Sequence, residues 1–138
     1  YHPELNTVLL NNSIEFIQGN IYQKVPVDGI KYKKLLHRTG ERNKNGLLYL
    51  VRNVSFEPAI YPQKDWVSNV LEQVSTAFKW NKPAIISTHR LNYMGSLNEK
   101  NRTDNLNLLF YIITQLQKKW PNIEFMSSDE LGENILSA

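Results

Sequence analysis

The sequence has no cysteine, which excludes disulfide bonds, thiolate metal sites and cysteine nucleophiles. It also lacks an apolar run near the roughly 20 residues that a helix needs to cross a bilayer. We therefore expect no membrane partner. The absence of cysteine fits a reducing or an oxidising compartment equally well, so it leaves the localisation open.

Two further patterns are missing. The six glycines are scattered, and none forms the G-x-G-x-x-G or Walker A loop that cradles phosphates, which disfavours nucleotide binding. The three histidines lack the spacing of a pair on one helical turn, so no self-contained zinc site is predicted. The net charge of +3 is dispersed, and only the lysines within residues 31–34 come close to a cluster. Nucleic acid is therefore not an expected partner.

What the chain does have is apolar content sufficient for one core. With 138 residues, 41% of them hydrophobic, residues 1–138 are expected to form a single domain or a piece of a larger one. The chain begins Tyr-His-Pro-Glu without an initiator methionine. We therefore expect a fragment.

Apolar segments alternate with amphipathic ones, which predicts an α/β fold with a mostly parallel sheet. Strands are expected at 14–18, 47–52, 83–88 and 123–126 in one sheet, with helices 65–79 and 101–119 packed on the same side. Short helices are expected after Pro3 and after Ser127. The two long helices should bury one face each, formed by Val67, Val70, Leu71, Val74 and Phe78 in the first and by Leu106, Leu109, Phe110, Ile113 and Leu116 in the second.

Residues 20–46 are the least regular part. The pairs Asp28-Gly29 and Asn45-Gly46 are turn signals around a strand near residues 30–37, which predicts a hairpin-like insertion. A lid or binding loop is one interpretation of this insertion. A solvated β-ribbon is the favoured one.

The stretch from Pro83 to Tyr93 carries the candidate site. The β-branched run after Pro83 predicts a buried strand with His89 at its carboxyl end, where ligands bind in α/β sheets. A single histidine there could be purely structural. Arg90, Asn92 and Tyr93 follow at once, and together they would form one polar rim.

Three more residues are candidates. Arg52 and Glu57 follow the apolar run Leu47–Val51, and either pair on the surface or line the same mouth as His89; we favour the mouth. Asp65 stands at the start of a helix, where a carboxylate caps free amides. It could also orient His89 and favour the charged imidazole, and the two roles are compatible.

Four segments, read together, carry a family resemblance. They are Tyr49–Asn53, Lys64–Trp66, Pro83–His89 and Glu124–Leu131. Together they look like the C-terminal half of a polysaccharide deacetylase of the NodB-homology type, in the divergent, Asn- and Lys-rich branch found in Bacteroidetes-like bacteria. The resemblance covers about the last two thirds of the chain well and the first third loosely.

The resemblance implies the C-terminal part of a distorted (β/α) barrel that removes N- or O-acetyl groups from a glycan with a divalent metal. In that family a strand-end histidine in a Leu-x-His pattern protonates the leaving group, and His89 has this position. An Asp-Trp pair packs near that histidine and tunes it, and Asp65-Trp66 match the pair. His89 and Asp65 are thus the expected catalytic residues, a glycan is the expected partner, and a bacterial periplasmic or secreted location is implied.

The chain also departs from the family pattern. Ser87 replaces the leucine, Arg90 follows the histidine where an aspartate is frequent, and the loop at 52–63 is longer than usual. The family's metal aspartate and His-x-x-x-His pair belong to its N-terminal half. We therefore expect no cofactor on this chain alone, a zinc-like divalent metal held by upstream residues, and a partner that is that N-terminal half or another copy of the chain.

The chemistry of deacetylation fits these residues. His89 would supply the acid on the leaving-group side, while Trp66 and Tyr93 would offer flat faces to a sugar ring. Two other functions stay open. One is a glycan-binding barrel module that has lost the chemistry, and the other is a glycoside hydrolase whose two carboxylates would be Glu57 and Asp65.

Overall fold

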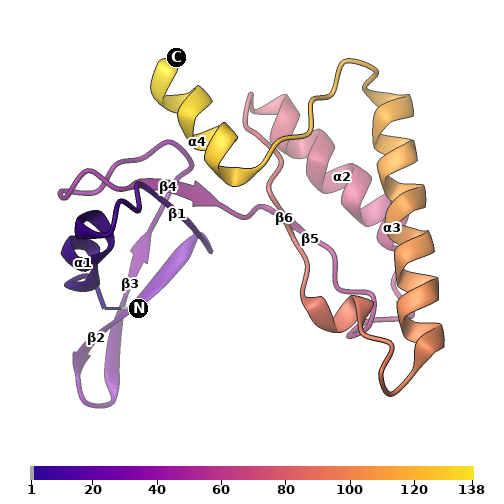
Figure 1. Ribbon diagram of the computed structural model, residues 1–138, viewed down its shortest axis with the longest axis horizontal. Helices are drawn as coiled ribbons and strands as arrows, with labels where there is room; N and C mark the ends of the chain where they lie inside the picture. The colour runs from indigo at the N-terminus through magenta and orange to yellow at the C-terminus, as the bar shows by residue number, and fades with distance from the viewer. Residues whose placement is uncertain (1) are drawn as a thin grey trace. The chain divides into compact units, whose positions relative to one another are not determined.

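The computed structural model describes residues 2–138, which form a mixed α/β structure with four α-helices and short, mostly parallel strands. The chain divides into two compact units (Figure 1). The first contains the residues up to Arg52 together with Met126–Ala138, and the second contains Asn53–Phe125. Each unit has its own short parallel pair of strands.

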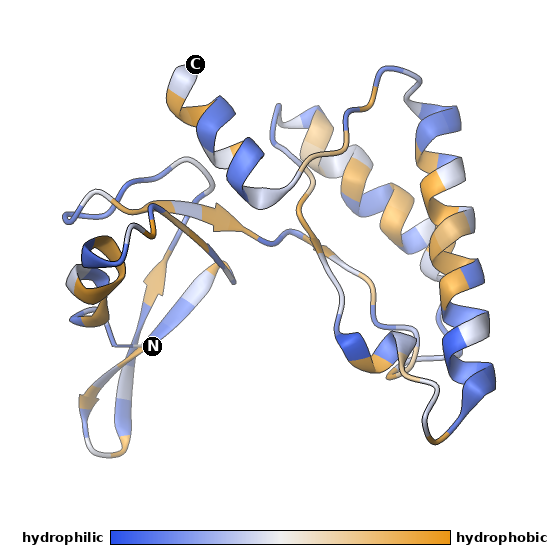
Figure 2. Cartoon of the chain, viewed as in Figure 1, coloured by the Kyte–Doolittle hydropathy of each residue, from blue (hydrophilic) through white to orange (hydrophobic). Residues whose placement is uncertain are grey.

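The first unit is built around β4 (Leu48–Val51), whose four residues are all buried. Figure 2 shows mostly hydrophobic colouring along this strand. It pairs in parallel with β1 (Phe16–Gly19), so that Phe16 lies opposite Leu48. The helices of this unit are α1 (Leu5–Asn11) and α4 (Ser128–Ser137), and α4 packs against both strands. Its capping box at Ser127 and Glu130 confirms the helix start predicted from the sequence.

The expected hairpin is present in the first unit. β2 (Tyr22–Asp28) and β3 (Lys31–Leu36) pair antiparallel, and Gly29 has the positive φ of 38° that the tight turn requires. Most of its side chains are exposed. The solvated β-ribbon is therefore the interpretation that this geometry favours.

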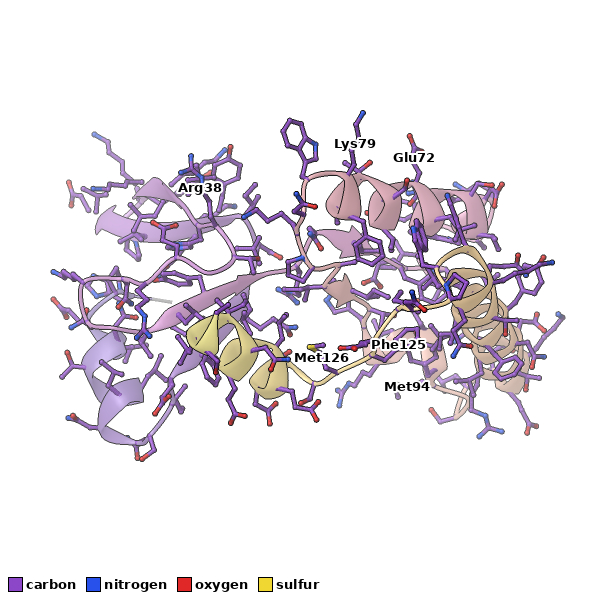
Figure 3. All side chains as sticks on the ribbon, turned by 90° about the horizontal axis from the view of Figure 1, so that it is seen from above. Arg38, Glu72, Lys79, Met94, Phe125 and Met126 are labelled. Atoms are coloured by element: carbon purple, nitrogen blue, oxygen red, sulfur yellow. The ribbon has the colours of Figure 1, made fainter. Side chains whose placement is uncertain are left out.

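The second unit contains the parallel pair β5 (Val54–Ser55) and β6 (Ile86–Ser87), one helix that packs against β5, and a second helix that packs against the first. The helices are α2 (Trp66–Lys79) and α3 (Glu99–Lys119), and the short 3-10 helix η1 (Arg90–Tyr93) follows β6. Glu72 and Lys79 project from the outer side of α2 (Figure 3). The core of the unit is formed by Val54, Phe56, Trp66, Val70, Val74, Ile112 and Leu116.

The buried face of α2 is the one predicted, since Val70 and Val74 are buried and Val67, Leu71 and Phe78 pack against the core. The face predicted for α3 is only partly right. Leu116 is buried and Leu109 packs against the core, as predicted. Leu106 and Phe110 are exposed, however, and Asn105 and Ile112 are buried in their place. The buried Asn105 explains the rotation, because its amide donates hydrogen bonds to Asn92 O and Asn101 Oδ1. Hydrophobic periodicity cannot predict that a polar residue such as Asn105 is buried.

The prediction of one sheet with four strands is also wrong, because residues 2–138 form three separate two-stranded sheets. The strand expected at 83–88 is reduced to Ile86–Ser87. Before it, the side chain of Asn53 replaces a neighbouring strand by accepting from Ile85 N and donating to Pro83 O. Residues 123–126 form no strand, and the Ile123 amide instead closes a turn onto Trp120 O.

Candidate functional site

The register of one strand pair determines the centre of the site. Val54 lies opposite Ile86 and Ser55 opposite Ser87, and the ladder continues with a hydrogen bond from Phe56 N to Ser87 O. Figure 1 shows β5 and β6 side by side within this unit. The same offset of 32 residues relates Glu57 to His89. A carboxylate and an imidazole therefore leave the carboxyl ends of two parallel strands next to each other, where ligands bind in α/β proteins.

The two side chains form a close ion pair or hydrogen bond. His89 Nδ1 lies 2.6 Å from Glu57 Oε1. The two residues differ sharply in exposure, because the His89 side chain is 64% exposed and that of Glu57 is 10% exposed. A buried carboxylate thus holds one edge of an imidazole whose remainder faces solvent.

The second oxygen of Glu57 is held as well. Asn92 Nδ2 donates to Glu57 Oε2 at 3.0 Å, and the same nitrogen lies 2.9 Å from Thr88 Oγ1 and 3.3 Å from Phe56 O. Asn92 has no exposed surface. The carboxylate of Glu57 is therefore fixed from both sides, by His89 on the solvent side and by Asn92 on the protein side.

Tyr93 extends this network to a phenol. Its hydroxyl lies 2.9 Å from Thr88 Oγ1. Burial raises the pKa of Tyr93, the hydrogen bond with Thr88 opposes that shift, and the nearby Glu57 carboxylate adds to it. A phenol is protonated at neutral pH even without this shift, so Tyr93 can act there as a hydrogen-bond donor.

This geometry defines what His89 can do. A carboxylate at Nδ1 selects the tautomer that carries its proton on Nδ1 and leaves Nε2 as the reactive nitrogen. Neutral His89 would then accept a proton at Nε2, and protonated His89 would donate one from it. The pair has the form of a general acid/base with a buried orienting carboxylate, as in catalytic triads.

Asp65 does not fill the orienting role predicted for it. The carboxylate that contacts His89 belongs to Glu57, and Asp65 caps α2 by accepting from Ser68 N at 3.0 Å. Hydrogen bonds from Ser68 lower the pKa of Asp65, as expected for a helix-capping carboxylate. The sequence offered both roles, and the structure shows capping.

Two residues predicted to contact substrate lie in the protein interior. Trp66 is buried, its ring meets Phe56 edge-on at 5.7 Å, and its Nε1 donates to Tyr61 O. Lys64 Nζ lies over the same ring at 4.3 Å. Trp66 therefore offers no open face to a sugar, and Asn92 is buried inside the hydrogen-bond network.

The remaining candidates are distributed between the units. Arg90 directly follows His89 and is exposed, and Tyr93 is half-buried. Arg52 belongs to the first unit, where its Nη2 donates to Asn20 Oδ1. Sequence reasoning missed Thr88 and Asn105. Only the register of the strand pair and the pairing of Asn105 with Asn92 O reveal them.

No protein-family model, curated protein or solved structure matches this chain.

Among residues 2–138, no three His, Cys, Asp or Glu side chains are grouped so that they could hold a metal ion. Among the same residues, no helix is long and apolar enough to span a membrane.

Proposed function

We propose that this chain provides the general acid/base of a polysaccharide deacetylase, as the C-terminal part of a (β/α) barrel. The single observation that carries the proposal is the Glu57–His89 pair, with 2.6 Å between Oε1 and Nδ1 and the imidazole facing solvent. Support also comes from its position at the ends of two parallel strands and from the sequence segments that resemble the family. The substrate class, an acetylated glycan, rests on the resemblance.

The pair would act when the acetyl group is cleaved. Water adds to the acetyl carbonyl carbon, and the bond to the sugar nitrogen or oxygen then breaks. His89 Nε2 gives its proton to that leaving atom, which departs as an amine or alcohol with acetate as the other product. The buried Glu57 carboxylate stabilises the imidazolium until the proton is transferred.

The proposal assigns no metal to this chain. Activation of the attacking water and any divalent metal are assigned to the N-terminal half of a longer protein. The chain alone is therefore proposed to be inactive.

The glycoside hydrolase alternative receives no support from the geometry. It requires one carboxylic acid and one carboxylate at the reacting bond. Glu57 is bonded through both oxygens to His89 and Asn92, and Asp65 caps α2. A glycan-binding module without chemistry is the outcome that the following experiment separates from deacetylation.

The test is His89→Ala in the longer protein, assayed by acetate release from N- and O-acetylated oligosaccharides. Turnover should fall about a hundredfold or more, because positioned acid catalysis contributes roughly 10² to 10⁴. His2→Ala is the matched control, since His2 is exposed and outside the site.

Oligosaccharide affinity, measured by calorimetry, should be nearly the same in His89→Ala and wild type. Unchanged turnover in His89→Ala would return this histidine to a structural role. Oligosaccharide binding without acetate release by the wild-type protein would support the binding module instead.

A further inference from the structure

We infer that Asn92 is a positioning residue, which fixes the Glu57 carboxylate and through it the tautomer and orientation of His89. This inference deepens the proposed function and rests on it for its catalytic meaning. The positioning itself is a property of the chain and can be measured without substrate. It gives Asn92 a role different from the substrate contact predicted from the sequence.

The orientation of the Asn92 amide follows from its partners. Ala59 N lies 3.0 Å from Asn92 Oδ1, and a backbone amide can only donate. The oxygen must therefore face Ala59, which turns Nδ2 toward Glu57 Oε2. With Asn92 donating to one oxygen, the other oxygen of Glu57 is directed to His89 Nδ1.

Asn92 is itself held by three separate segments. Its side chain bonds to the loop after β5 through Ala59 and Phe56, and to the end of β6 through Thr88. Its carbonyl oxygen accepts from Asn105 Nδ2 of α3 at 2.9 Å. These bonds join the two strand ends to the helix, so the amide cannot turn without breaking several buried hydrogen bonds, each costly to leave unmade.

Because Asn92 is buried, its position requires an amide rather than a carboxylate. Asn92 has no exposed surface, and an aspartate at the same place would have nearly the same shape. The aspartate would lack the Nδ2 group that donates to Glu57 Oε2, and it would place a second carboxylate about one hydrogen-bond distance from that oxygen. Two carboxylates that close share one proton, so Glu57 would present less negative charge to His89 Nδ1 and hold it less firmly.

The first test uses the 138-residue chain and long-range ¹H–¹⁵N NMR correlations, which identify the protonated nitrogen of a neutral histidine. Wild-type His89 should carry its proton on Nδ1. In Asn92→Asp the signal should move toward the Nε2-protonated form that prevails for histidine in water. Asn107→Asp is the matched control, because it adds the same charge at an exposed position of α3. Glu57→Gln provides the reference for a lost carboxylate.

A second measurement needs no variant and protects the test against misfolding of Asn92→Asp. The side-chain amide protons of Asn92 should exchange with deuterated water far more slowly than those of exposed Asn107 in the wild-type chain. Equal exchange rates for the two side chains would overturn the inference. So would a His89 tautomer unchanged in a folded Asn92→Asp chain.

Activity in the longer protein separates this inference from the proposed function. Asn92→Asp should lower kcat about tenfold or more with KM nearly unchanged, because Asn92 touches no substrate. A predicted tautomer shift in a protein that releases no acetate would reject deacetylation but support the positioning role. Normal kcat in Asn92→Asp, together with activity lost in His89→Ala, would reject the positioning role alone.

Discussion

Two histidines of this chain differ in exposure and in hydrogen-bond partner. His89 is exposed and bonded to a carboxylate, whereas His37 is buried. The His37 ring stacks on Tyr49, with 3.7 Å between ring centroids, and its Nε2 lies 2.8 Å from Gln23 Oε1. A neutral amide partner and a low-exposure site favour an uncharged ring. Burial accordingly lowers the pKa of His37, and the nearby Glu41 only partly opposes the shift.

This shift predicts a pH dependence of the stability of the first unit. The unfolded chain takes up a proton at His37 near pH 6.5, whereas the folded chain does so only at lower pH. The unfolded state therefore binds more protons in between, and stability falls as pH drops from about 6.5 through the folded pKa. One proton limits the slope to about 1.4 kcal/mol per pH unit.

Urea unfolding between pH 5 and 8, followed by tyrosine fluorescence or NMR signals of residues 2–52, measures this slope. His37→Phe, which keeps an aromatic ring for Tyr49, should reduce the slope, and His2→Phe at an exposed position should leave it unchanged. A slope that is the same in His37→Phe and wild type would show that His37 titrates alike in both states.

At this scale the sequence predicted His89 as a site residue with Asp65 as its orienting carboxylate, and the structure pairs His89 with Glu57 instead. The polar cluster around His89 is visible as a motif, and Glu57 was assigned to the same mouth. The choice between Glu57 and Asp65 as orienting carboxylate depends on which residues face each other across β5 and β6. Register depends on three-dimensional pairing, so no local pattern could decide it.

At the scale of elements, the close contact between α4 and β1 gives the next prediction. A Cβ added to Gly132 would lie 2.6–2.7 Å from ring atoms of Phe16, so the helix approaches the strand more closely than alanine permits. Alanine favours a helix by roughly 0.5–1 kcal/mol over glycine. Overpacking of a core contact costs roughly 1–3 kcal/mol, so the clash should outweigh the helix propensity.

Gly132→Ala should therefore lower the free energy of unfolding of the first unit, as measured by chemical denaturation. Gly19→Ala is the matched control, because an added Cβ there meets no atom within 4 Å. The double variant with Phe16→Leu should recover part of the loss. A stabilised Gly132→Ala chain would mean that Phe16 moves aside without cost.

The buried face was predicted correctly for α2 but only partly for α3. In α2 the apolar face and the buried face coincide, because the core of this helix is purely apolar. In α3 a buried asparagine shifts the face, and Phe110 is exposed although its spacing suggested burial. Periodicity finds a helix in both cases, but it assigns the face correctly only where burial follows hydrophobicity.

For the whole molecule, the α/β class was predicted correctly and the single sheet was not. Strand and helix order can be read from apolar runs and turn residues. Whether strands join one sheet depends on which groups bond to the free edge of each strand. In this structure some of those edges are bonded by side chains rather than by another strand. Gln73 of α2, for example, bonds to both the amide and the carbonyl of Ser55 and so covers one edge of β5 there. This edge needs no further strand at that residue.

The exposed apolar side chains carry the last prediction, which follows from the proposal that the chain works together with another polypeptide. In the second unit Leu97 is fully exposed and Phe110 is 73% exposed, and in the first unit Ile30 is 97% exposed. Isolated exposed apolar residues in turns and bends, such as Ile30 and Leu97, are ordinary, but a large ring exposed on a helix, as in Phe110, favours association. The chain should therefore self-associate, with a sedimentation coefficient that rises with concentration in analytical ultracentrifugation.

The variant Phe110→Glu should shift this equilibrium toward the monomer, since α3 exposes that ring and a charge there opposes apolar contact. Asn107→Glu adds the same charge on the same helix at a polar position and is the matched control. If the proposed N-terminal half covers the same surface, a polypeptide that supplies it should compete with self-association. A wild-type chain that stays monomeric at all accessible concentrations would contradict the prediction. It would also weigh against the proposal that another polypeptide covers these apolar side chains.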